Sequence, residues 1–574
     1  MPAFRNSRLA GAALAALLVA TAASAQVGPP VRIGPPGAPP PPPPYGAPPP
    51  ASPYSPPPRS SGITIDQLAP PSPDAAGVLG AGNRGLPEPL WRGTARAVVQ
   101  ALLPKIGATS SPALQDLAYR LLATSAAPPV GPGEGSLLAL RAERLTNALG
   151  RPDTALALLQ SLPSAQGSED LAKISVDLAF LAGDTRSACA TVRARDKSWR
   201  SPYWDQGLVA CQAIDGDGAG AQLGLDILRE AKVKDEGFAS LVERAVGNDS
   251  RLPDALPSPQ PIALALLNKA NLPLPKKAFD SARLPVLVAV ATGPGFPAEQ
   301  RAAAAEKAAA FGALAPELLA EAYLAMPLDD DDLANPLSKA DSAGGTKGRA
   351  ILFRAAHDAA VPLAKANMLQ ALLAKTPRAD LYPAVLRAAR PLLLELPVSP
   401  ELRPVAADMA HALYALDQPG EAAQWLSLAG PEGAAVLPLA HVAAGATAPE
   451  WTETALTDLV GGSKKDPSLG LKRASLLVQL LAAEGAPAPD ALVLPLMDQR
   501  IGGPGSLGPG LMIESEAAGK HLGGTILTSL AALGDEGAGG PSLTVAQAIA
   551  GLRAVGLTDE ARHLAIDAAV AAGL

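Results

Sequence analysis

Three stretches of the sequence share one spacing and decide the fold: LGRPDTALALL at residues 149–159, AGDTRSACATV at 182–192 and DGDGAGAQLGL at 215–225. In each, a turn glycine is followed five residues later by an alanine, and Gly150, Gly183 and Gly216 recur every 33 residues. A glycine ends a helix readily in the left-handed conformation, and a small residue lets two helices approach closely. The spacing therefore predicts a series of antiparallel helix pairs.

The same form returns twice beyond these stretches. Asp417 takes the place of the glycine in LDQPGEAAQWL, before Ala422, and Gly556 precedes Ala561 in VGLTDEARHLA. Elsewhere, apolar residues three and four apart recur in segments of 10–16 residues, which glycine, proline or Asp-Gly turns separate. The sequence has no run with the alternating pattern of a strand, so we predict an all-α fold.

The 33-residue period over residues 136–247 resembles the tetratricopeptide family of helical repeats, and WDQGLVACQAIDGD (204–217) is the segment most similar to it. The resemblance implies two antiparallel helices in each unit of about 34 residues. Beyond residue 247 the period is lost although helices persist, so we expect an irregular α-solenoid. In overall make-up the chain also resembles exported alanine-rich proteins of alphaproteobacteria that have no established activity.

Composition limits the class of function. The chain has 574 residues, of which 48% are hydrophobic, 18% charged and only 3% aromatic. Alanine and leucine dominate, which favours closely packed helices over sheets. The formal net charge of −7 argues against a nucleic-acid-binding protein, because such a protein needs a basic face.

The first 25 residues have the organisation of a signal peptide. Arg5 and Arg8 precede an apolar core at residues 9–23, and Ala-Ser-Ala at 23–25 forms a cleavage signal before Gln26. The core is short for a membrane-spanning helix, which needs about 20 residues, and no later stretch is long and apolar enough. We therefore expect export to the periplasm, with no transmembrane segment in the mature chain.

Four regions follow the expected signal peptide. Residues 26–86 are predicted to be a disordered proline-rich linker, because proline lacks the backbone donor and fixes φ. Residues 87–250 carry the tetratricopeptide-like repeats, and residues 251–500 form an irregular helical-repeat region. Residues 501–574 comprise a glycine-rich linker and the C-terminal helices.

The two cysteines of the chain, Cys189 and Cys211, lie on successive helices of the repeat frame. Each is 11 residues from the turn near Arg200, so both lie at the same level of one antiparallel pair. A disulfide is then geometrically plausible, and an oxidising periplasm permits it. A zinc site and a catalytic thiol are weaker alternatives because no histidine is near in sequence, and the spacing excludes a Cys-x-x-Cys pair.

Aromatic residues gather at the same turn. Trp199, Tyr203 and Trp204 flank Arg200, with further basic residues nearby, in a chain that is otherwise poor in aromatics. One interpretation is a packing corner between repeat units. The other is an interaction patch formed by Trp199, Arg200, Tyr203 and Trp204, since Trp, Tyr and Arg are enriched where proteins bind partners.

Three other segments have weak resemblances to chemical sites. Asp215, Asp217, Gly220 and Asp226 match part of a calcium loop. However, the fifth position is Ala219 and the twelfth is an aspartate instead of the bidentate glutamate, so a helix cap explains the segment better. The acidic run at residues 329–332 fits a solvated loop before a helix better than a divalent-ion site. Glu514 and Ser515 match a lytic transglycosylase motif, but its parts occur in the wrong order.

No recognised nucleophile elbow, phosphate-binding loop or His-Glu-x-x-His zinc motif occurs in the sequence. We therefore assign no catalytic, cofactor-binding or metal-binding residues. The sequence favours an exported, non-enzymatic helical scaffold that binds a protein or a cell-envelope component. The alternatives are a peptidoglycan-acting enzyme or its helical accessory subunit, with Glu514 as the required carboxylate, and a structural spacer that uses the proline-rich arm.

Overall fold

The computed structural model describes residues 72–133, 135–161, 169–233, 235–251, 260–378, 380–461, 468–497 and 507–574. The expected signal peptide and most of the expected proline-rich linker lie outside these residues. The described part is all-α, and its only β interaction is an isolated bridge between Leu79 and Thr124. The all-α class and the irregular solenoid of antiparallel helix pairs are therefore confirmed.

The first group of helices covers the region of the 33-residue period. They are α1 (Arg96–Leu102), α2 (Pro112–Ala123), α3 (Leu137–Asn147), α4 (Pro152–Gln160), α5 (Glu169–Leu181), α6 (Thr185–Arg193), α7 (Pro202–Asp215), α8 (Gly218–Glu230) and α9 (Glu236–Ala245). The next group runs through the middle of the chain. They are α10 (Pro261–Lys269), α11 (Lys276–Asp280), α12 (Leu284–Thr292), α13 (Ala298–Ala310), α14 (Pro316–Leu324), α15 (Asp330–Ala334), α16 (Pro336–Ala343), α17 (Gly345–Asp358), α18 (Pro362–Ala374) and α19 (Tyr382–Leu394).

The last group completes the chain. They are α20 (Ala406–Ala415), α21 (Pro419–Ala429), α22 (Leu437–Ala444), α23 (Glu453–Gly461), α24 (Ser468–Glu484), α25 (Asp490–Met497), α26 (Leu507–Ala518), α27 (Leu522–Leu533), α28 (Ser542–Ala554) and α29 (Thr558–Ala571). Short 3-10 helices join some of them, including η2 (Leu103–Lys105), η6 (Gly445–Thr447) and η7 (Gly534–Gly539).

The turn glycines have the conformation that the spacing predicts. Gly150, Gly183, Gly216 and Gly556 have φ angles of 59°, 76°, 85° and 89°, all in the left-handed region. Asp417 has a φ of 54° and so occupies the same turn without being glycine. Such a conformation costs a side-chain-bearing residue free energy, and surrounding contacts must hold it.

The alanines five residues after these turns are all completely buried. Ala155, Ala188, Ala221, Ala422 and Ala561 each have 0% exposure. Each lies early in the second helix of its pair. Because protein interiors are closely packed, a larger side chain at these five positions would have to displace its neighbours.

The packed part of the chain begins before residue 87, where the sequence places the end of the linker. Asp74 pairs with Arg96 at 2.8 Å and accepts a hydrogen bond from the Leu138 amide at 3.0 Å. Arg141 is buried and donates to the carbonyls of Ala76, Leu122 and Thr124. These contacts hold residues 74–76 against α2 and α3. The proline content of residues 26–86, on which the prediction of a disordered linker rests, gives no sign of such polar contacts.

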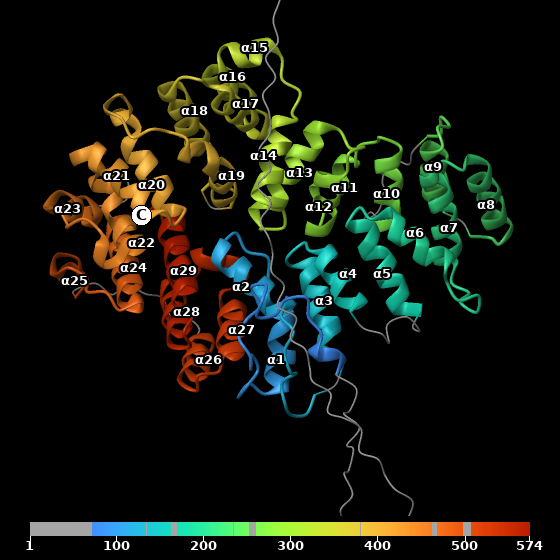
Figure 1. The fold of residues 1–574 in the computed structure, drawn as a ribbon, viewed down its shortest axis with the longest axis horizontal. Coiled ribbons are helices and arrows are strands. Elements are labelled where there is room, and N and C mark those ends of the chain that lie inside the picture. The colour runs from blue at the N-terminus through green and yellow to red at the C-terminus, as the bar shows by residue number, and fades with distance from the viewer. Residues whose placement is uncertain are drawn as a thin grey trace, which may run out of the picture. The chain divides into compact units, whose positions relative to one another are not determined.

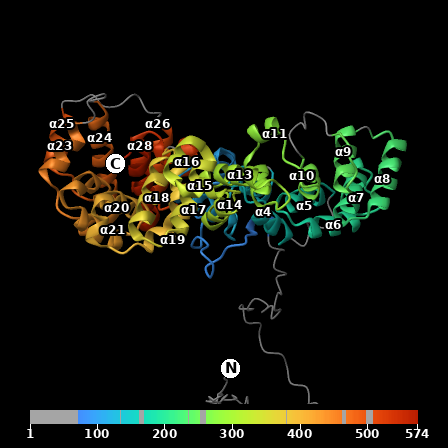
Figure 2. The ribbon, with the colours of Figure 1, turned by 90° about the horizontal axis from the view of Figure 1, so that it is seen from above.

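The C-terminal helices return to the N-terminal ones, which the repeat pattern does not predict. Helix α2 packs against α27 and α29, and α1 packs against α27. Figure 1 shows the red helices α27–α29 beside the blue α1 and α2. Figures 1 and 2 place α8 and α9 at one end of the unit formed by residues 70–574, and α23 and α25 at the opposite end.

The glycine-rich segment is only partly outside the described residues. Residues 501–506 are not among them, but Gly508 and Gly510 lie within α26. Gly510 has close neighbours, because an added Cβ would lie 2.1 Å from the side chain of Gln547. At Gly510, therefore, a glycine accommodates the side chain of the neighbouring α28.

We predict that Ala188→Leu destabilises the protein by about 1–3 kcal/mol, because the added methyl groups must be forced between α5 and α6. The matched control is Ala190→Leu in the same helix, since Ala190 is exposed. The measurement is the urea midpoint of each variant. Equal midpoints for the two variants would show that the helix approach does not depend on alanine.

Candidate functional site

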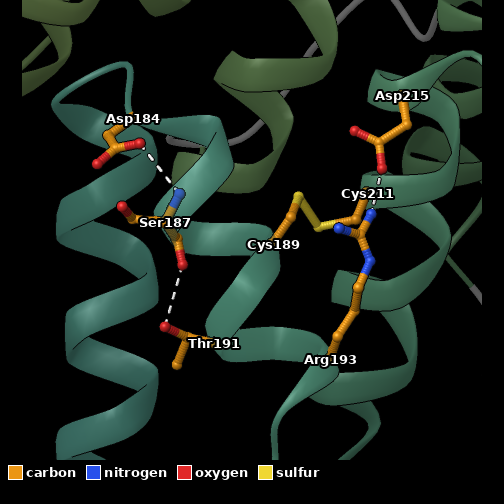
Figure 3. The surroundings of a disulfide bond; sticks show 7 residues. All are labelled: Asp184, Ser187, Cys189, Thr191, Arg193, Cys211 and Asp215. Carbon is orange, nitrogen blue, oxygen red and sulfur yellow. Dashed lines mark hydrogen bonds and ion pairs between the residues drawn. A yellow bond between two sulfur atoms is a disulfide. The ribbon is translucent and has the colours of Figure 1, made fainter.

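The two cysteines lie at disulfide distance between α6 and α7, as the repeat frame predicts (Figure 3). Their Cα atoms are 5.6 Å apart, and Cys189 and Cys211 are 2% and 0% exposed. The long Arg193 side chain runs alongside them to an ion pair with Asp215. The pair therefore joins two neighbouring repeat units inside their shared core, away from solvent.

The aromatic residues of the expected patch form a packed corner around Trp204, which is 0% exposed. The Trp204 indole N–H donates to Glu169 at 3.0 Å, and the Tyr203 hydroxyl donates to Asp177 at 2.8 Å. Trp199 stacks on Trp204 with ring centroids 5.1 Å apart. Burial raises the pKa of Asp177, and the hydrogen bond from Tyr203 partly opposes that effect.

The basic residues at this turn are largely committed to local ion pairs. Arg195 pairs with Asp205 at 2.7 Å, and Arg193 pairs with Asp215. Arg200 is exposed, while Trp199 and Tyr203 are half-buried. Of the four residues in the predicted patch, Trp204 thus belongs to the core, and Arg200 is the one that is fully available at the surface.

The weaker sequence candidates take ordinary structural positions. Asp217 caps α8 by accepting the Gly220 amide at 2.9 Å. The acidic run caps α15, and two of its carboxylates, Asp331 and Asp332, pair with Lys339 and Lys347. Glu514 is exposed on α26 and accepts a hydrogen bond from Gln547 at 2.8 Å.

No helix among the described residues is long and apolar enough to cross a membrane. No group of three or more His, Cys, Asp or Glu side chains in the described part is placed to hold a metal ion.

A cavity of about 700 Å³ lies where the C-terminal helix α29 meets α2, and we call it the seam cavity. Its walls come from the start of α2, the start of α19, the turn between α20 and α21, η7 and α29. Seven carboxylates, three arginines and one histidine line it. They are Asp116, Asp380, Asp417, Asp535, Glu536, Glu560, Asp567, Arg84, Arg378, Arg387 and His563.

Asp567, in the wall of this cavity, joins α29 to the start of α2. Its carboxylate accepts hydrogen bonds from the Ser111 hydroxyl at 2.5 Å and from the Ala113 amide at 2.9 Å. Burial raises the pKa of Asp567, although these two hydrogen bonds and the nearby Arg387 lower it in part. The Ser111 hydroxyl donates directly to a carboxylate and also caps α2, so the pair is a helix cap, not a nucleophile with its base.

Three other carboxylates of the seam cavity have basic partners. Asp116 pairs with Arg84 at 2.6 Å, and Glu560 pairs with Arg120 at 2.6 Å. Asp417 accepts hydrogen bonds from His563 at 2.8 Å and Arg562 at 3.2 Å, contacts that hold its left-handed backbone. The hydrogen bond to Asp417 is the main reason why the pKa of His563 is raised.

Three carboxylates of the cavity, Asp380, Asp535 and Glu536, are exposed and make no ion pair or hydrogen bond within the described residues. The unpaired negative charge therefore gathers at the side of the cavity that solvent reaches. An opening of this kind attracts a positively charged group and repels an anionic one.

A second cavity, of about 820 Å³, lies between α22, α24 and α29, and we call it the Trp451 cavity. Most of its wall is alanine and proline from residues 442–448 and 485–489. His441 stacks on Trp451 with centroids 4.0 Å apart, and Glu484 and Arg562 also line the cavity. Burial raises the pKa of Glu484 to about 7, although Arg553 and Arg562 oppose the shift.

Neither cavity could be found from local sequence pattern. The residues that meet at the seam, such as Ser111, Arg387 and Asp567, are hundreds of positions apart. The turn form shared by residues 416–426 and 555–565 was the one signal, because it marks the two helix pairs that bring Asp417 and His563 together.

Comparisons with known proteins found no matching family model, no matching curated protein and no matching solved structure.

We predict that replacing both cysteines with alanine lowers the free energy of unfolding by about 3 kcal/mol, the value for a closed loop of about 23 residues. The measurement is the urea midpoint of the double variant and of the parent chain, each with and without reductant. Reductant should lower the midpoint of the parent alone. An equal effect of reductant on both proteins would show that no disulfide between Cys189 and Cys211 stabilises the fold.

We predict that Glu484→Gln raises stability at alkaline pH. The pKa of Glu484 in the folded chain is about 7, above its usual 4.5, so the folded state holds the proton more tightly. The stability that the tighter binding of this proton provides is fully present below about pH 4.5 and is lost as pH rises through about 7. Melting temperatures of variant and parent should therefore agree at pH 4.5, and the variant should melt higher at pH 8.

Glu230→Gln provides the control for this pH series, because Glu230 is exposed on α8. It should leave the melting temperature unchanged at both pH values. A Glu484→Gln variant that melts no higher than its parent at pH 8 would contradict the assigned pKa.

Proposed function

We propose that the protein is an exported, non-enzymatic helical scaffold that binds a protein or a cell-envelope component, and that the seam cavity receives a basic segment of that partner. The observation that carries the proposal is the set of unpaired carboxylates Asp380, Asp535 and Glu536 at the exposed side of the cavity. A lysine- or arginine-rich segment would meet carboxylates that have no existing ion pair to displace.

Export to the periplasm is part of this proposal. Two observations support it: the signal-like organisation of residues 1–25, and a cysteine pair at disulfide distance, which an oxidising compartment maintains. We also infer that residues 136–247 form a tetratricopeptide-like array. The left-handed turns at Gly150, Gly183 and Gly216 support this inference.

Binding fits the seam cavity better than catalysis does. Its most buried carboxylate and its histidine are already engaged: Asp567 caps a helix, and His563 is hydrogen bonded to Asp417. The enzyme alternative needs a carboxylate with a raised pKa in a cleft. The exposed position of Glu514 on α26 does not favour that role.

The test is fluorescence anisotropy of a labelled lysine-rich decapeptide titrated with the purified full chain. We expect saturable binding that weakens as salt is raised, and at least fivefold weaker binding by Asp535→Asn/Glu536→Gln. The matched control is Glu230→Gln/Glu236→Gln, which removes two exposed carboxylates on α8 and α9. This control should bind as the parent does.

Equal binding of a glutamate-rich decapeptide, or no effect of Asp535→Asn/Glu536→Gln, would overturn the assignment of the cavity. Release of soluble fragments from peptidoglycan by the purified chain, abolished in Glu514→Gln, would overturn the non-enzymatic function.

A further inference from the structure

The Trp451 cavity contains a carboxylate and a guanidinium that lie near each other but do not pair. Glu484, the last residue of α24, makes no hydrogen bond or ion pair within the described residues. Arg553 on α28 also lines the cavity and makes no ion pair within that part of the chain. Its charge nevertheless lowers the pKa of Glu484, so the two groups are close. The cavity therefore holds two opposite charges, and direct contact neutralises neither of them.

A ligand in the cavity can reach both groups. The two side chains are half-buried, and their unbonded oxygen and nitrogen atoms keep contact with solvent. Arg553 Nη1 donates to the Ala483 carbonyl at 2.7 Å, which fixes the guanidinium at the end of α24 and leaves Nε and Nη2 as donors for another acceptor. Glu450, Gly485 and Thr558 are exposed in the cavity wall, so this side of the cavity opens to solvent.

The other ionisable groups of the cavity do not change this balance. Arg562 directs its Nη2 to Asp417 and Asp559, at 3.2 and 3.6 Å. Burial lowers the pKa of His441, which favours the uncharged ring. Glu450 is exposed to solvent, which screens its charge. A ligand with one charge would therefore be attracted by one of the two unpaired groups and repelled by the other, whereas a zwitterion would be attracted by both.

A free amino acid has the required pair of charges. Its ammonium and its carboxylate are attached to the same carbon atom, so they can bridge two groups that are close but not in contact. The ammonium would donate to Glu484 and the carboxylate would accept from Arg553, in charge-assisted hydrogen bonds. A peptide fits less well, because each further residue moves its terminal charges about 3.5 Å farther apart.

The remaining wall favours an apolar side chain on that amino acid. Alanine and proline from residues 442–448 and 485–489 form most of the wall, and Leu481 and Trp451 also line it. Ligand sites are typically apolar clefts of about 300–1,000 Å³ with a few polar groups that fix orientation. At about 820 Å³ this cavity has room for a large side chain.

We propose that the Trp451 cavity binds a free amino acid with a large apolar side chain, whose ammonium pairs with Glu484 and whose carboxylate pairs with Arg553. This is a small-molecule site. It is separate from the seam cavity and goes beyond the binding function proposed for that cavity.

The test is isothermal titration of the purified full chain with L-phenylalanine at pH 8. Two comparison compounds each lack one of the two charges: phenethylamine has no carboxylate, and 3-phenylpropionate has no ammonium. We expect saturable binding of phenylalanine and at least tenfold weaker binding of each comparison compound.

Two variants separate the roles of the two charges. Glu484→Gln should weaken binding of phenylalanine at least tenfold without weakening that of 3-phenylpropionate, because it removes only the partner of the ammonium. Arg553→Gln should weaken binding of phenylalanine without weakening that of phenethylamine. A folding defect would instead weaken binding of all three compounds. The matched controls, Glu230→Gln and Arg186→Gln, change exposed residues on α8 and α6 and should bind as the parent does.

A pH series gives a second readout, because only the ionised form of Glu484 attracts an ammonium. Burial raises the pKa of Glu484 to about 7, while Arg553 of α28 and Arg562 of α29 oppose the shift. Affinity for phenylalanine should therefore increase about tenfold from pH 6 to pH 8. His441 of α22 favours its uncharged form over this range, and exposed Glu450 is ionised throughout. Glu484→Gln should remove the increase.

Absence of phenylalanine binding by the parent would overturn the proposal. Equal affinity for either comparison compound, or unchanged affinity in both folded variants, would overturn the assignment of the two charges. A parent affinity that does not change with pH would contradict the role of Glu484. These failures are distinct from failure of the proposed function, because the seam cavity is tested with other residues and a charged peptide.

Discussion

One polar contact joins helices from opposite ends of the described part and defines how they meet: the carboxylate of Asp567 on α29 caps the first turn of α2. The first amides of a helix have no partner within the helix, and an aspartate that accepts from them also meets the positive end of the helix dipole. The capping residue Asp567 lies 456 residues after Ser111, whose hydroxyl donates to it. A helix cap usually comes from a residue close in sequence. This one closes a long loop, which costs conformational entropy, and it fixes the junction between two helices that are far apart in the chain.

Small residues impose the second constraint. The fully buried alanines Ala155, Ala188, Ala221, Ala422 and Ala561 keep paired helices close, and the glycines that precede most of them allow a tight reversal. Sequence spacing predicted these features because they are local: turn, cap and helix contact lie within a few residues of each other. The cysteine pair was predictable for the same reason, since its two members are level across one turn.

The sequence contained a further local signal that the patch interpretation did not use. Trp204, Gly207 and Cys211 are three to seven residues apart on α7 and therefore share the face that packs into the core. The seam cavity, in contrast, had only one local signal, the turn form shared by residues 416–426 and 555–565. Its residues come from elements that meet only because α29 returns to α2, and no helical period specifies which distant faces will meet. For the same reason the packed segment at Asp74 was not separable by composition from the proline-rich residues before it.

Both cavities are lined by residues outside 136–247, the region of the 33-residue period, and this placement has a physical cause. Equivalent helix pairs fill the space between them with matched alanines and leucines, whereas pairs of different length leave space that polar side chains must line. In the seam cavity several of these side chains form ion pairs, and the exposed carboxylates of Asp380, Asp535 and Glu536 remain without one. In the Trp451 cavity Glu484 and Arg553 remain without one. Arg562 is linked to both, because its Nη2 pairs with Asp417 of the seam cavity and the residue also lines the Trp451 cavity. The left-handed turn at Asp417, the place where the repeat pattern departs from glycine, is therefore the point at which the two cavities share a side-chain contact.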